Sequence, residues 1–147
     1  MGMTETMDDL AVLASRVRLA LVPLTRQLRS QNIDLTATQA SALATISRRQ
    51  PVTVGDLAKV EHVSSPMITK VVKVLEEAGL VRKEVDATDR RVSRLSLTSE
   101  GARRLERSRT RKNAWLAKRL RSLNDHEIAA LEAAIPVLER LSAGAAE

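Results

Sequence analysis

Three arginines, Arg90, Arg91 and Arg94, follow closely on two aspartates, Asp86 and Asp89. Two short runs of alternating apolar residues, 80–85 and 92–97, flank this polar segment, and this pattern predicts a β-hairpin with a basic tip. A guanidinium group is planar, permanently charged and forked, so it suits phosphate and guanine. It also suits the narrow, electronegative minor groove of duplex DNA. The chemistry expected of the hairpin is therefore the binding of a polyanion.

The residues before the hairpin predict two helices joined by a tight turn, which is a helix-turn-helix. We expect a short helix over 54–60, a turn over 61–63 and a longer helix over 65–78 that Ser64 caps and Gly79 stops. Its inward face carries Ile68, Val71, Val72 and Leu75. A recognition helix needs such an apolar back and small polar or basic residues in front, to reach base edges in the major groove.

The candidate DNA-contacting residues of this helix are Ser65, Pro66, Met67, Thr69, Lys70 and Lys73. The alternative for the polar residues is an ordinary solvated helix face. Met67 has two equally weighted roles, contact with a thymine methyl group or filling of a packing gap. Pro66 falls in the first turn, where a missing N–H costs little.

Composition limits the classes of function. The chain has 147 residues and a net charge of +6, which favours nucleic acid over other partners. The only aromatic residue is Trp115, so stacking on unpaired bases is not expected. There is no cysteine, and the two histidines lie far apart, so no disulfide, metal or cofactor is predicted. No apolar run approaches 18 residues, so we expect a cytoplasmic protein without a membrane partner.

The remaining elements are expected to be helices around this centre. Residues 1–7 suggest a frayed start, before a helix over 8–29 that Pro23 should kink or break near residues 19–22. Capping boxes predict helix starts at Thr36 and Asn124, and Thr98 should cap a helix over 99–122. Pro136 should bend the last helix, and Ser142 should begin a loose tail.

These elements predict a mainly α fold with a small β-hairpin wing. Residues 36–98 would form a winged helix-turn-helix that binds DNA. Residues 1–35 and 99–147 would supply dimerisation helices, because their apolar stripes need burial and the winged module has little spare core to accept them. A two-fold dimer matches the symmetry of a pseudo-palindromic operator.

The chain also resembles the MarR-type family of transcriptional regulators. The segments DATDRR at 86–91 and LSLTSEG at 95–101 are similar to that family's wing. The segments SSPMITK at 64–70 and LEEAGLVR at 75–82 are similar to its recognition helix and the exit from it. The layout matches over about residues 8–142, and the specific motifs lie between Leu57 and Gly101. Ala87 stands where proline is common in the family, which bears on the stiffness of the wing tip.

The resemblance implies a homodimer that pairs through its first and last helices and carries two DNA-binding lobes. It also implies a small-molecule effector, often an aromatic acid, bound between the dimer and DNA-binding regions. By resemblance, Arg91 is the wing arginine that enters the minor groove. The alternative is that Asp89 holds Arg91 to shape the hairpin, and both roles can coexist. Arg90 and Arg94 are expected to contact phosphate or to be structural.

Other residues have less specific roles. The basic run from Arg103 to Lys112 is expected to be mainly a solvated helix face, although Arg103 and Arg104 could reach phosphate. We expect Trp115 at the dimer interface or beside a ligand, and His62 to make a local hydrogen bond or a phosphate contact.

The sequence leaves four functions to consider, and it favours one of them. The favoured one is a sequence-specific regulator, most simply a repressor that a small, possibly phenolic ligand releases. The alternative is an architectural protein that coats DNA without sequence preference. An enzyme is disfavoured because no nucleophile–base pair, metal triad or phosphate loop is recognisable. A sensor that has lost DNA binding is disfavoured by the basic wing.

Overall fold

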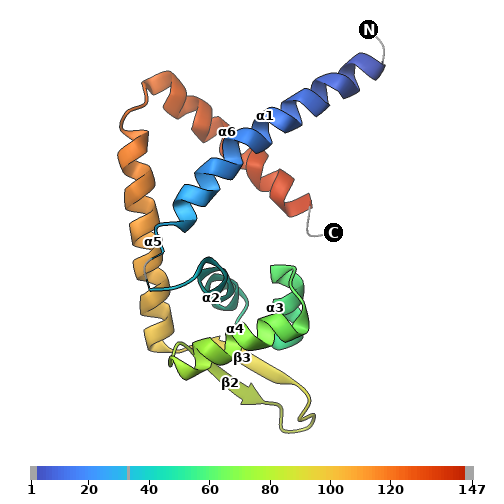
Figure 1. The fold of residues 1–147 in the computed structure, drawn as a ribbon, viewed down its shortest axis with the longest axis vertical. Coiled ribbons are helices and arrows are strands. Elements are labelled where there is room, and N and C mark those ends of the chain that lie inside the picture. The colour runs from blue at the N-terminus through green and yellow to red at the C-terminus, as the bar shows by residue number, and fades with distance from the viewer. Residues whose placement is uncertain (1–2, 33, 145–147) are drawn as a thin grey trace. The chain divides into compact units, whose positions relative to one another are not determined.

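The computed structural model describes residues 3–32 and 34–144. Its elements, in chain order, are α1 (Met3–Arg29), α2 (Ala37–Arg49), β1 (Val52–Thr53), α3 (Val54–Glu61), α4 (Ser65–Glu77), β2 (Val81–Val85), β3 (Ser93–Leu97), α5 (Ser99–Leu120) and α6 (Asp125–Gly144) (Figure 1). The predicted fold class, mainly α with a small wing, is confirmed. The chain divides into two compact units at Lys112 and Asn113, within α5, and each unit is described separately.

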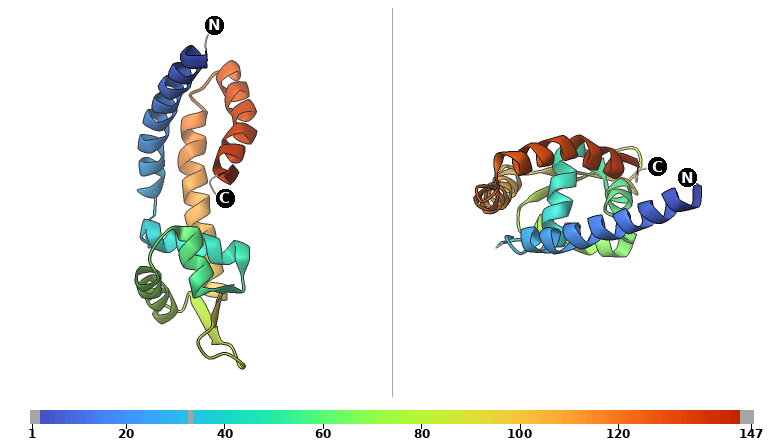
Figure 2. Two further views of the ribbon diagram at one scale, coloured as in Figure 1. Left: turned by 90° about the vertical axis from the view of Figure 1, so that its right-hand side faces the viewer. Right: turned by 90° about the horizontal axis from the view of Figure 1, so that it is seen from above.

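The sheet is antiparallel and has the strand order β1-β3-β2. The hairpin pairs Val81 with Leu97 at its base and Val85 with Ser93 near its tip. Its strands lie within one residue of the predicted runs. Figure 2 shows the hairpin extending beyond helices α2, α3 and α4 of the same unit. The unpredicted strand β1 pairs Val52 with Leu95 and Thr53 with Arg94, and so ties the helix-turn-helix to the wing.

The core of the first unit lies between the helix-turn-helix and the sheet. Its largest fully buried side chains are Leu43, Ile46, Leu57, Ile68, Leu75, Leu80 and Leu95. They come from α2, α3, α4, β3 and the residue before β2, so every element of the predicted winged module contributes. Burial of aliphatic side chains is the main stabilising contribution to such a core, at about 25 cal/mol per Å² of apolar surface. The helix-turn-helix and the hairpin are thus held by one continuous apolar cluster.

Local side chains determine where the helices begin. Thr36 and Gln39 form the predicted capping box of α2, with both reciprocal hydrogen bonds present. The hydroxyl of Thr53 accepts from the Asp56 amide, and that of Ser64 accepts from the Met67 amide. His62 ends α3 in the left-handed region at φ 55°, and its backbone N–H closes the helix. The turn of the helix-turn-helix is therefore 62–64, close to the predicted 61–63.

Helix α1 contradicts two expectations. It begins at Met3, so the frayed start predicted for residues 1–7 is wrong for residues 3–7, and residues 1 and 2 lie outside the described residues. It also continues through Pro23 to Arg29, so of the kink or break predicted near residues 19–22 the break is wrong. A proline removes one backbone donor. Strong helix formers flank it on both sides, including Ala20, Leu21 and Leu24, so one lost hydrogen bond ends neither half.

Helix α6 is also longer than expected. The capping box of Asn124 and Glu127 is present, with both hydrogen bonds made. The helix then runs through Pro136 to Gly144, so the loose tail predicted from Ser142 is wrong for residues 142–144. Residues 145–147 lie outside the described residues. Within the described ranges, no helix combines the length and the apolar character that a bilayer span would need.

Candidate nucleic-acid interface

Helix α4 separates an apolar back from a polar front. Ile68, Val72 and Leu75 are fully buried, and Val71 is half-buried, as predicted. The candidate contact residues all remain exposed: Ser65, Pro66, Met67, Thr69, Lys70 and Lys73. A face held open by a buried apolar back is available to a partner.

One of these side chains, that of Thr69, already has a local hydrogen-bond partner. The Thr69 hydroxyl donates to the Ser65 carbonyl over 2.7 Å. The methyl group and both acceptor lone pairs of Thr69 remain for an outside partner. Ser64, expected to be a cap, accepts from the Met67 amide as its role requires. Lys70 and Lys73 have no ion pair within 4 Å among the described residues, so their ammonium groups remain open to phosphate.

Asp86 organises the hairpin tip, a role that the sequence analysis missed. One carboxylate oxygen of Asp86 accepts from the Thr88 amide over 2.8 Å, the Thr88 hydroxyl over 2.7 Å and the Asp89 amide over 3.1 Å. Its other oxygen pairs with Arg94. The bonds from the Thr88 hydroxyl and from Arg94 lower the pKa of the Asp86 carboxyl well below its usual range. The turn is therefore built around a permanent negative charge.

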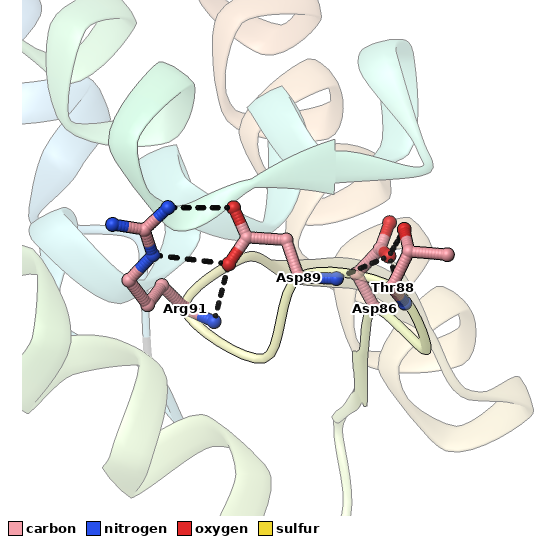
Figure 3. Close-up of polar contacts among 4 residues, drawn as sticks. All are labelled: Asp86, Thr88, Asp89 and Arg91. Carbon is pink, nitrogen blue, oxygen red and sulfur yellow. Dashed lines mark hydrogen bonds and ion pairs between the residues drawn. The ribbon is translucent and has the colours of Figure 1, made fainter.

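Arg91 projects from this tip and is held by Asp89 (Figure 3). Its Nε donates to Asp89 Oδ1 over 3.1 Å and its Nη2 to Oδ2 over 3.3 Å, which makes a two-point fork. The Arg91 amide also donates to Oδ1, over 3.0 Å. These bonds lower the pKa of the Asp89 carboxyl, the largest contribution coming from the Arg91 side chain. Yet the Arg91 side chain is 91% exposed. The expected wing-shaping contact of Asp89 is therefore present, and it leaves Arg91 accessible.

The other two wing arginines differ from each other. Arg94 faces Thr53 and Glu84 across the strands and pairs with Asp86, so it has a structural contact in the free protein. Arg90 is exposed and makes no ion pair among the described residues. Ser93, next to Arg94, is half-buried, consistent with neighbouring strand residues facing opposite ways.

A compact joint connects α4 to the wing. Gly79 ends α4 at φ +75°, a conformation that suits glycine. The Thr98 hydroxyl donates to the Gly79 carbonyl over 2.6 Å and accepts from the Gly101 amide over 3.0 Å. A Cβ at Gly101 would lie 2.0 Å from the Leu80 carbonyl oxygen. The start of α5 thus packs directly on the backbone that links α4 to β2.

The first half of α5 carries more cations than its acidic residues can pair. Glu100 makes ion pairs with Arg103 at 2.7 Å, Arg104 at 3.5 Å and Arg107 at 3.6 Å. The hydrogen bond from Arg103 is the main cause of the lowered pKa of Glu100. One carboxylate is therefore shared among three guanidinium groups. Further along, Arg119 stacks on Trp115 with its Cζ 4.1 Å from the ring centroid.

Side-chain hydrogen bonds also connect α3 to α2, at residues that were not predicted as part of the site. The carboxylate of Glu61, at the end of α3, accepts from the Ser41 hydroxyl over 2.6 Å and from the Thr45 hydroxyl. Thr45 is fully buried. Only the tertiary fold brings these residues together, since they are 16 and 20 positions apart. Among the residues described, no group of three or more acidic or histidine side chains is placed to hold a metal ion.

Comparison with known proteins agrees with this geometry. The sequence model of the MarR family matches residues 35–93. An uncharacterized HTH-type transcriptional regulator from Mycobacterium leprae is 36% identical over 80% of this chain and 84% of its own length. A crystal structure of a putative transcriptional regulator from Pseudomonas aeruginosa is 32% identical, with a TM-score of 0.81 over 92% of this chain and 96% of that one.

A mutant of S. aureus MepR, solved bound to an oligodeoxyribonucleotide, has a TM-score of 0.64 and is 20% identical, over 89% of this chain and 96% of that one. This last likeness concerns the fold alone. The extent of the sequence matches, which agrees with the exposed α4 face and the basic hairpin, shows the family. The chain belongs to the MarR family of transcriptional regulators.

Proposed function

We propose that the protein is a homodimeric, sequence-specific repressor that binds a pseudo-palindromic operator and that a small anionic molecule releases it. The observation that carries this proposal is the pairing of an open polar face on α4 with an exposed, pre-oriented Arg91 on the adjoining hairpin. The chemistry of both elements suits duplex DNA. Because such a regulator acts on the chromosome, we also place it in the cytoplasm.

Each protomer would read one half-site. In this proposal α4 enters the major groove, with Ser65, Pro66, Met67 and Thr69 towards base edges and Lys70 and Lys73 towards phosphate. Arg91 enters the adjacent minor groove, where the potential is most negative. Arg90 contacts phosphate, and Arg94 either joins it or keeps its structural pairing with Asp86. The DNA-bound MepR mutant supports the use of this fold on DNA.

The dimer would form through the terminal helices. Helix α1 exposes Leu10, Leu13, Val17, Leu21 and Leu24, with exposed fractions between 36% and 59%. Helix α6 exposes Leu131, Ile135, Leu138 and Leu141. Apolar stripes of this length are rarely left in water, and pairing between two copies would bury them. In this proposal residues 1–35 and 99–147 pair the protomers, and residues 36–98 read DNA.

The effector would bind in a cavity of the first unit. This cavity has a volume of about 460 Å³, within the range of small-molecule sites, and Arg29, Arg109 and Lys112 line it with Glu61 and Ser41. Burial, with added repulsion from Arg109 and Arg29, lowers the pKa of Lys112. An anion would relieve this crowding of positive charge. Glu61 also ties α3 to α2, so a ligand there could favour a different placement of the DNA-reading helices.

The test is a pair of measurements on the purified protein. Footprinting on the DNA upstream of its own gene should show protection of two half-sites about one helical turn (roughly 34 Å) apart. The affinity for that site should exceed the affinity for unrelated DNA by about 10³ or more at the same salt concentration. A ratio near one would instead favour the architectural alternative. Addition of candidate phenolic acids should weaken the protection if the effector proposal is correct.

A further inference from the structure

A second, smaller cleft lies between the α1–α2 connection and the first half of α5, which run beside each other in Figure 1. Its volume is about 110 Å³, too small for a drug-sized ligand and sufficient for a group of a few atoms. It is lined principally by Gln31, Asn32, Asp34, Arg104, Arg107 and Arg111. The side chains that supply its positive charge all come from α5.

The three arginines form one charged row on α5. They are spaced three and four residues apart, so their side chains share a helix face, and like charges at this spacing repel. Glu100 is the only acidic residue paired with them in the described structure, and it serves Arg104, Arg107 and also Arg103. Arg111 has no ion-pair partner within 4 Å in the same set of residues. The row therefore keeps an excess of positive charge.

Two buried N–H donors at this cleft lack hydrogen-bond acceptors. The Ser108 hydroxyl donates to Asn32 Oδ1 over 2.8 Å, which fixes the amide and leaves its Nδ2 without a partner. Arg104 Nε is also unpartnered, because Glu100 lies 3.5 Å from it without forming a hydrogen bond. Buried polar groups are normally satisfied, so two such donors beside a row of arginines indicate a missing acceptor.

From this arrangement we infer that the cleft binds a small oxyanion, either phosphate or a compact carboxylate. Its oxygens would accept from Asn32 Nδ2 and Arg104 Nε and would face the guanidinium groups of Arg107 and Arg111. Charge-assisted bonds to arginine are the strong kind, and the arginine fork matches both anions. Asp34, which also lines the cleft, opposes an anion by its charge and so limits the affinity. The cleft shares Asn32 and Ser108 with the larger cavity proposed for the effector, but its three arginines do not line that cavity.

The experiment is titration of the full-length protein with inorganic phosphate at constant ionic strength, followed by calorimetry and by thermal unfolding. A ligand that binds only the native state raises the unfolding temperature in a saturable way. Arg107→Gln should weaken phosphate binding by roughly tenfold, the loss expected when one charge-assisted bond is removed. The matched control is Arg103→Gln, which removes an arginine of similar exposure (69% against 64%) that pairs with Glu100 but does not line the cleft.

A third variant should bind phosphate more tightly than the unmodified protein. Asp34→Asn removes the opposing charge and should tighten phosphate binding several-fold, whereas a merely structural role of the arginine row gives no reason for a gain. Acetate in place of phosphate separates the two ligand sources, and binding of either anion with this variant pattern supports the site. Equal effects of phosphate and chloride, or equal losses with Arg103→Gln and Arg107→Gln, would overturn it. The proposed site would also be overturned if Arg107→Gln binds phosphate as tightly as the unmodified protein while binding DNA more weakly.

Discussion

Arg91 shows how one side chain can be both structural and available. Its fork on Asp89 restricts the side chain, as an isolated surface arginine would have to be restricted on binding, yet the side chain remains almost fully exposed. Pre-orientation of this kind lowers the entropic cost of binding. The two roles that the sequence left open for Arg91 therefore need not compete: the contact with Asp89 is observed, and the DNA contact remains a proposal.

Replacement of Arg91 should affect DNA binding and leave folding unchanged. Arg91→Ala is expected to weaken operator binding by about 1–3 kcal/mol, the loss typical of a base-edge contact. Electrophoretic mobility shifts at fixed salt would measure it. The matched control is Arg140→Ala, which removes an equal charge from an exposed position on α6. If the two variants lose the same affinity, Arg91 contributes only through overall charge and its assigned role is wrong.

The carboxyl of Asp86 should keep the wing tip ordered throughout the physiological pH range. Its hydrogen bonds favour the ionised form, so its pKa is lower in the folded state than in the unfolded state. Its stabilising contribution is therefore complete above the ordinary aspartate pKa of about 3.9 and diminishes only as the pH falls below that value.

Nuclear magnetic resonance can test this role of Asp86. The Thr88 and Asp89 amide signals should not change through titration of Asp86 between pH 5 and 8. In Asp86→Ala at pH 7, both amides should lose protection from hydrogen exchange, because both donate to that carboxylate. The control Asp8→Ala, on α1, should leave them unchanged. Full protection in Asp86→Ala would show that the turn is held by other contacts.

At the scale of elements, the sequence predicts structure wherever a local side chain determines a boundary. Thr36 with Gln39 and Asn124 with Glu127 identify helix starts because each cap involves residues three apart. The hairpin and the apolar back of α4 follow from side-chain periodicity. These local rules recovered the fold class and placed the candidate contact residues on the elements expected for them.

Features that depend on distant residues were not predictable in this way. Strand β1 has two residues, and only pairing with Leu95 and Arg94 of β3 makes it a strand. The contact of Glu61 with Ser41 and Thr45 forms across separate helices. The break expected at Pro23 is also absent, because a long run of good helix formers tolerates one missing donor. In each case the outcome depends on tertiary contacts or on the whole helix.

Two helical glycines offer a matched test of the packing between α5 and the wing. Gly101→Ala would place a Cβ against the Leu80 carbonyl, and overpacking of this kind is expected to cost about 1–3 kcal/mol of unfolding free energy. Gly55→Ala, in α3, meets nothing within 4 Å and should be neutral or stabilising by up to about 1 kcal/mol. Urea denaturation would measure both. A Gly101→Ala variant as stable as the unmodified chain would contradict the close approach.

At the scale of the whole molecule, the proposal depends on two copies acting together. The winged module has its own continuous core, whereas α1 and α6 display apolar side chains that the single chain leaves exposed. A regulator with one reading helix would recognise only a short half-site. Two reading helices held by a dimer specify a longer site and give it two-fold symmetry. In this proposal, dimerisation links the exposed terminal helices to sequence-specific binding.

Sedimentation equilibrium of the unmodified protein at micromolar concentration, with and without operator DNA, tests this central claim most directly. The account predicts a species of about twice 16.1 kDa in free solution and two protomers on each operator duplex. A stably folded species of 16.1 kDa under these conditions, or one protomer bound per duplex, would contradict it.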